Sequence, residues 1–98
     1  MTTQTEKTGT THKTFFLGQT VFLAEGEWAN GRPIDDLGEV RATAAEARED
    51  ADTRFGWLSA DEQSRVLSLR VRAYEITAID EDGGVGGMVS RDVVMEIV

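Results

Sequence analysis

Apolar and polar side chains alternate along Val66–Ile79 (VLSLRVRAYEITAI), and this alternation constrains the fold more than any other feature of the sequence. Successive side chains of a β-strand point to opposite faces, so a period of two predicts a long strand with one apolar face and one polar face. The apolar face carries Leu67, Leu69, Val71 and Ala73, and the polar face carries Ser68, Arg70, Arg72 and Tyr74. Such a strand is typical of an antiparallel sheet that is covered on one side.

Three further segments have strand character. Thr14–Trp28 is rich in aromatic and β-branched residues, and the Asn-Gly pair that follows it is a strong turn signal. Residues 34–42 are therefore expected to return as the second strand of a hairpin. The last segment, 88–98, ends in VVMEIV, which favours a strand, and a short helix beginning at Ser90 is the alternative.

A helix is predicted between these strands. Thr43 and Glu46 have the spacing of a capping box, in which the first side chain accepts a hydrogen bond from the amide of the second residue. The helix is expected over 44–57, with one apolar face formed by Ala44, Ala47, Ala51, Phe55 and Leu58. A second capping pattern at Ser59 predicts a short helical turn over 60–65.

Together these elements predict an α+β fold. The sheet is expected to be small and antiparallel, with about four strands in the order β-β-α-β-β and one main helix packed on one face. The length of 98 residues fits a single domain. Residues 1–13 are rich in threonine and hold little to bury, so they are expected to form a flexible tail before a single domain at 14–98.

The composition makes several kinds of catalytic site unexpected. Without cysteine the chain has no disulfide, no thiolate nucleophile and no cysteine metal site. The single histidine, His12, falls in the expected tail, and no serine lies in a nucleophile elbow. The protein is therefore expected not to be an enzyme.

Neither a metal nor a cofactor is expected. Asp80–Asp82 resembles the start of a calcium loop, but the twelfth position counted from Asp80 is Arg91 instead of a glutamate. The glycines at 83–87 lack the spacing of a dinucleotide or phosphate loop, and a turn between strands explains them. No apolar run approaches the length of a membrane span, so the cytoplasm is the expected location.

Negative charge is concentrated in one part of the chain. The net charge is −8, and residues 25–62 hold eleven acidic residues against four arginines. A field of this sign repels phosphate backbones, so a basic protein surface is a more suitable partner than nucleic acid or a membrane. The candidate partner-binding residues are Asp35, Asp36, Glu39, Glu49, Asp50, Asp52, Asp61 and Glu62. They share one surface if the hairpin and the helix are neighbours, and an ordinary solvated helix face is the alternative.

A second candidate surface lies on the polar face of the long strand. Arg70, Arg72 and Tyr74 form a basic aromatic strip, and Trp57 is added to this candidate surface. A sheet face of this kind can bind nucleic acid. Pairing of the arginines with acids on neighbouring strands is the alternative, and the acidic surroundings favour it.

These observations predict a non-enzymatic protein-binding module. In size and charge the chain is similar to small acidic inhibitors that phages and plasmids carry against restriction or CRISPR systems, although no motif transfers a role to any residue. The most specific interpretation is an inhibitor that mimics nucleic acid and blocks a basic nucleic-acid-binding surface of a protein complex. The alternative is an antitoxin-like or regulatory partner that binds through a sheet edge or a hydrophobic patch.

Overall fold

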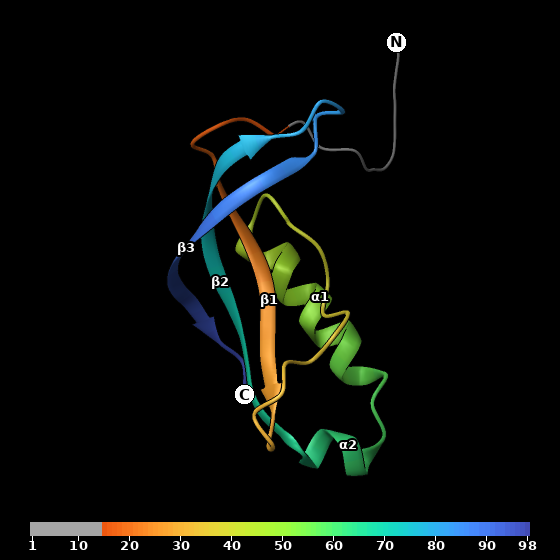
Figure 1. Cartoon of the computed structure of the whole chain (residues 1–98). Coiled ribbons are helices and arrows are strands. Elements are labelled where there is room, and N and C mark those ends of the chain that lie inside the picture. Colours follow the sequence, from red (N-terminus) through yellow and green to blue (C-terminus); the bar gives the residue numbers. More distant parts are fainter. Residues whose placement is uncertain (1–14) are drawn as a thin grey trace.

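The computed structural model describes residues 15–98, so the flexible tail expected for residues 1–13 lies outside the described part of the chain. The elements in this part are β1 (Thr20–Trp28), α1 (Ala44–Gly56), α2 (Ala60–Ser64), β2 (Val66–Ile79) and β3 (Val85–Glu96). The strands form one antiparallel sheet in the order β1-β2-β3, and α1 contacts β1 and β2 (Figure 1). The predicted α+β class is confirmed.

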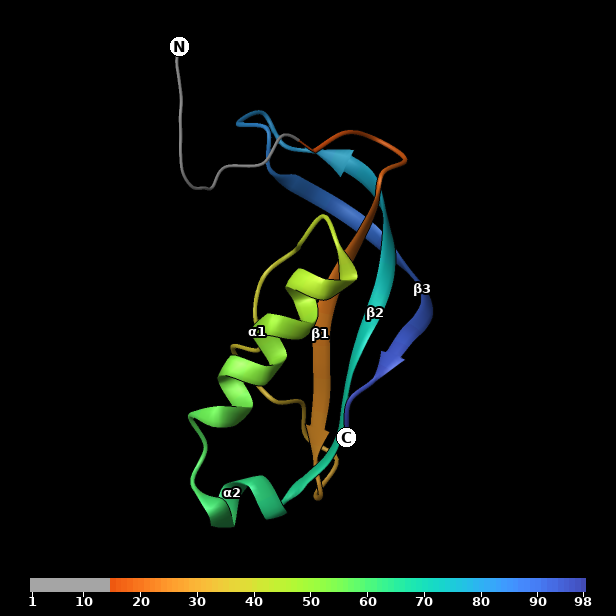
Figure 2. The same cartoon turned by 180° about the vertical axis from the view of Figure 1, so that it is seen from behind.

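β2 is the central strand, and its bounds agree with the alternating segment of the sequence. Leu69, Val71 and Ala73 are buried, as expected for the apolar face, but Leu67 is 62% exposed, at the end of β2 where the register with β1 shifts. Arg70 and Arg72 alternate with them and belong to the opposite face. Figure 2 shows β3 on the side of β2 that lies away from α1. One strand therefore supplies both the packing surface for the helix and a polar surface behind it.

The predicted fourth strand is absent from the described residues, so the observed order is β-α-α-β-β with three strands. Residues 34–42 form a loop because three positions interrupt an extended ladder. Pro33 has no N–H to donate. Asp36 has a φ of 60° and Gly38 a φ of 144°, and both values turn the chain away from strand geometry.

The loop still follows the outer edge of β1. Isolated bridges join Phe22 to Arg41 and Glu27 to Pro33. At the first bridge both backbone N–H groups donate to the opposite carbonyl oxygen, at 2.8 Å each. The loop therefore satisfies part of the edge of β1 without becoming a regular strand.

Both helices begin at the predicted capping residues. The hydroxyl of Thr43 accepts a hydrogen bond from the amide of Glu46 at 3.2 Å, and the same hydroxyl donates to the Glu46 carboxylate at 3.1 Å. Ser59 and Glu62 form a complete capping box at the start of α2. No helix in residues 15–98 has the length and apolar composition needed to cross a membrane.

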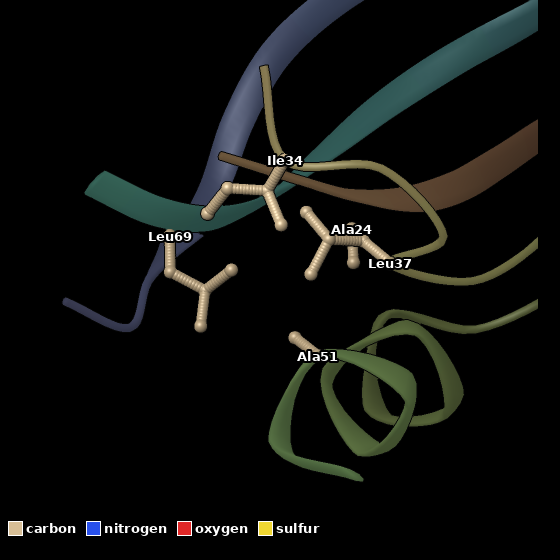
Figure 3. Packing of buried hydrophobic residues seen from close by; sticks show 5 residues of the cluster. All are labelled: Ala24, Ile34, Leu37, Ala51 and Leu69. Atoms are coloured by element: carbon tan, nitrogen blue, oxygen red, sulfur yellow. The ribbon is translucent and has the colours of Figure 1, made fainter. Parts of the chain in front are cut away.

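The core lies between α1 and the sheet (Figure 3). Its buried cluster consists of Ala24, Ile34, Leu37, Ala51 and Leu69. Ile34 and Leu37 come from the loop and extend into the space between β1 and α1. Ala51 has no exposed surface, and its small side chain lets the helix approach the sheet closely. Phe55 is only partly buried and packs at the border of this cluster.

Gly26 provides a test of the close packing between β1 and β2. A Cβ atom at this position would lie 2.4 Å from the carbonyl oxygen of Ser68, which belongs to the neighbouring backbone. We expect Gly26→Ala to lower the free energy of unfolding by about 1–3 kcal/mol, as overpacking does. Urea unfolding followed by circular dichroism measures the change.

Gly56→Ala is the matched control. A Cβ atom at Gly56 meets no atom within 4 Å, and the residue belongs to α1, where alanine is favourable. We expect no loss of stability for this variant. Equal stability of the two variants would show that β1 and β2 are not packed this closely.

Candidate functional site

The loop at 35–41 lies against one side of α1. Nε of Arg54 donates to the backbone oxygen of Asp35 at 3.2 Å. A Cβ atom at Gly38 would come within 2.6 Å of the Asp50 side chain, so this part of the loop touches the helix. Nε and NH2 of Arg41 donate to the Asp50 carboxylate at 2.7 and 2.9 Å. The loop that replaces the predicted strand is therefore a direct neighbour of the helix, as Figure 1 also shows.

Five predicted partner-binding residues are exposed on this loop and on the adjacent helix, and one of them, Asp52, pairs with Arg48. The other four are Asp35, Asp36, Glu39 and Glu49, which we call the acidic ridge. Within residues 15–98, the one ion pair of their carboxylates is a 3.6 Å contact between Glu39 and Arg41, and the Glu39 side chain is still 76% exposed. The ridge thus presents carboxylates that are available to a partner.

Asp50 has a different role from the ridge. Its side chain is only 18% exposed and receives both hydrogen bonds from Arg41. The hydrogen bonds to Asp50 raise the pKa of Arg41 above its ordinary value. This bidentate pair connects the loop to α1 and supports the ridge instead of extending it.

The other three predicted acids are engaged locally. Asp52 pairs with Arg48 at 3.4 Å and Asp61 pairs with Arg65 at 2.8 Å, both at helical i,i+4 spacing. The carboxylate of Glu62 accepts the Ser59 backbone N–H at 2.9 Å. Hydrogen bonds from the Ser59 backbone N–H and side chain lower the pKa of Glu62. Asp61 and Glu62 belong to α2, beyond the C-terminal end of α1 (Figure 1).

The basic aromatic strip on β2 faces carboxylates of β1. NH1 and NH2 of Arg70 donate to the two oxygens of Glu27 at 2.9 and 2.7 Å, and Nε of Arg70 donates to Glu25 at 2.8 Å. Glu25 also accepts hydrogen bonds from Nε of Arg72 at 2.8 Å and from the hydroxyl of Tyr74 at 2.7 Å. The arginines are therefore paired with acids of a neighbouring strand.

Sequence reasoning did not assign Glu25 and Glu27 to any site. The available signal was their spacing of two residues in the β1 segment, which places both side chains on one face of a strand. The register was also needed, because Glu25 lies opposite Arg70 and Glu27 lies opposite Ser68. Trp57, the fourth member of the second candidate surface, is 75% exposed and follows α1, which covers the opposite face of the sheet.

The paired network shifts the ionisation of its members. Partial burial opposes ionisation of Glu25, but hydrogen bonds from Arg72, Tyr74 and Arg70 together outweigh it and lower the pKa of Glu25. Burial, followed by the hydrogen bond to Glu25 and the charge of that residue, raises the pKa of Tyr74 to about 12. On the polar face of the sheet, charge-assisted hydrogen bonds therefore connect the basic aromatic strip with Glu25 and Glu27.

A cavity lies at the C-terminal end of β1, between the turn that follows this strand and α2. Its volume is about 420 Å³, and it is lined by Trp28, Ala29, Asn30, Arg32, Glu62 and Arg65. Among these residues, Glu62 was a predicted partner-binding residue. In residues 15–98, no group of three or more histidine, aspartate or glutamate side chains is arranged to hold a metal ion.

Comparisons with protein-family models, with curated proteins and with solved structures give no match for this chain. The acidic ridge, the basic aromatic strip and the cavity are therefore interpreted from their own geometry and charge.

Tyr74 is the single tyrosine of the chain, so its titration can be measured by absorbance and reports on its hydrogen bond to Glu25. The ordinary tyrosine pKa of 10.0 applies to the unfolded chain, and the folded value is about 12. The neutral form of Tyr74 therefore contributes stability that is complete below pH 10 and is lost as the pH rises through 12. We expect phenolate absorbance to rise with a midpoint near 12 while circular dichroism follows the fold.

Glu25→Gln should move this midpoint downward, because the charge that opposes the phenolate is gone. Glu75→Gln is the control, since Glu75 pairs with Arg91 instead of Tyr74. A wild-type midpoint at the ordinary tyrosine value in the folded protein would contradict the network.

Proposed function

We propose that this protein is a non-enzymatic protein-binding module whose acidic ridge occupies a basic surface of a protein partner. In its most specific form it is an inhibitor of the phage or mobile-element type, of the anti-restriction or anti-CRISPR class. It would act by charge mimicry, with carboxylates taking the place of phosphates on a nucleic-acid-binding surface.

The observation that carries this proposal is the contact between the loop at 35–41 and α1. Asp35, Asp36 and Glu39 come from the loop, and Glu49 comes from the helix. The Arg41–Asp50 pair and the close approach of Gly38 to Asp50 hold these two segments together. Four exposed carboxylates from separate parts of the sequence therefore lie on two adjoining segments.

The support beneath the ridge favours binding with little loss of conformational freedom. The loop is attached to β1 at two bridges, and its Ile34 and Leu37 side chains are buried. A surface that is already ordered has less entropy to lose when a partner binds. Exposed carboxylates on such a surface also speed association with a basic partner through long-range attraction.

Charge reversal on the ridge tests the proposal. We expect Asp35→Lys combined with Glu49→Lys to weaken binding of a purified partner by at least about tenfold at low salt, with most of the loss in the association rate. The difference from wild type should shrink as salt rises, because ions screen exposed charges. Partners are captured on the immobilised wild-type protein, and surface plasmon resonance then measures their affinities.

The matched control is Glu81→Lys combined with Asp92→Lys. These residues are exposed and lie in the β2–β3 turn and on β3, away from the ridge. The control changes the net charge by the same amount and should retain near wild-type binding. Equal affinity of the ridge variant and wild type at low salt would refute a ridge contact.

The charge-mimicry part of the proposal requires a second test. The partner should bind a nucleic acid, and wild-type protein should displace that nucleic acid in a competition assay. The ridge variant should require a higher concentration for the same displacement. If the partner binds the ridge and its nucleic acid simultaneously, charge mimicry is excluded while the binding function stands.

The edge of the sheet is a second candidate surface. β3 pairs with β2 on one side, and its other edge has no partner strand among the described residues. Val89 and Val94 on β3 are 42% and 47% exposed. A regulatory partner that adds a strand here would bind through backbone hydrogen bonds and apolar contacts. In that case Val89→Lys combined with Val94→Lys should abolish binding at all salt concentrations, and the ridge variant should bind normally.

A further inference from the structure

The cavity beside α2 differs in charge from the rest of the molecule. It is lined by two arginines, Arg32 and Arg65, against a single carboxylate, Glu62, in a chain whose net charge is −8. Its volume of about 420 Å³ falls within the range of about 300–1,000 Å³ that is typical of small-molecule sites.

The walls of the cavity are held by backbone hydrogen bonds. The N–H of Ala29 donates to the carbonyl oxygen of Arg65 at 2.7 Å and so ties the turn after β1 to the end of α2. Within the turn, the N–H of Trp28 donates to the Arg32 oxygen at 2.8 Å, and the N–H of Arg32 donates to the Asn30 side chain at 2.9 Å. The turn and the end of the short helix are therefore joined directly, without a ligand between them.

The polar side chains of the cavity are mainly hydrogen-bond donors. The Arg32 guanidinium, the Trp28 indole N–H and the Asn30 side-chain NH2 have no acceptor within residues 15–98. Arg65 uses one nitrogen on Asp61 and keeps its other N–H groups. Of the acceptor side chains, Glu62 accepts from Ser59 through one carboxylate oxygen and Asn30 accepts from Arg32. This excess of donors matches a ligand that supplies several acceptor oxygens.

The cavity also has an aromatic residue, Trp28, in its lining. Trp28 is partly buried and packs against the core cluster, so its indole ring is held in position. Aromatic rings stack favourably on indole, and a guanidinium binds phosphate with paired hydrogen bonds. Both features occur here within one cavity.

We propose that this cavity binds a nucleoside monophosphate or a ligand of the same chemistry, with its aromatic ring against Trp28 and its phosphate between Arg32 and Arg65. This site is independent of the acidic ridge, because it uses other residues and the opposite charge. Binding here and binding at the ridge are separately testable.

Adenosine monophosphate is the probe, and the full-length protein is titrated. In a Trp57→Phe background the remaining tryptophan is Trp28, so its fluorescence reports occupancy of the cavity directly. Trp57 is 75% exposed, so its replacement leaves the packing intact. We expect saturable quenching by adenosine monophosphate, and at least about tenfold weaker binding of adenosine and of inorganic phosphate.

Arg32→Ala should weaken the binding of adenosine monophosphate by at least about tenfold, because the unpaired guanidinium is lost. Arg48→Ala is the control that removes the same charge, since Arg48 lies on α1 and pairs with Asp52. Calorimetry repeats the measurement without relying on fluorescence.

Each other result would overturn a named part of the assignment. Absence of saturable binding, or unchanged binding in Arg32→Ala, would refute the site. Equal affinity for inorganic phosphate would remove the role of the ring, and equal affinity for adenosine would remove the role of the arginines.

Discussion

The hydrogen-bonded ladder between β2 and its two neighbours is the interaction on which the rest of the structure depends. β2 pairs with β1 along most of its length and with β3 on its other edge. Because side chains alternate along a strand, this one ladder places Leu69 against the helix and Arg70 against the acids of β1. The core and the polar network are therefore consequences of a single register. A shift of one residue would exchange the two faces and lose both.

The charged groups of the protein divide into those that stabilise the fold and those that remain available. Glu25 and Glu27 satisfy the arginines of β2, and Asp50 satisfies Arg41. These carboxylates are partly buried, so their pairs are less screened than pairs at the surface. The acidic ridge is what remains exposed beside α1 after these pairs have formed. Net charge alone does not distinguish the two groups, and their geometry does.

Local signals in the sequence located β2 and the starts of both helices. The alternation over Val66–Ile79 gave the bounds of β2, and the capping residues placed the start of each helix. The expected hairpin strand at 34–42 was wrong, because two left-handed positions and a proline outweigh its apolar residues. The pairing of Glu25 with Arg70 and the cavity beside α2 depend on segments far apart in the chain. Such long-range contacts leave no periodic signal in a single sequence.

The loop between β1 and α1 combines buried apolar side chains and exposed acidic side chains within a few residues. Ile34 and Leu37 are buried and maintain the architecture, whereas Asp35, Asp36 and Glu39 face the solvent. Substitutions at the buried positions disturb the packing of the core, whereas substitutions at the exposed positions leave that packing intact. An evolving lineage is thus free to change the exposed positions repeatedly while the scaffold is inherited unchanged.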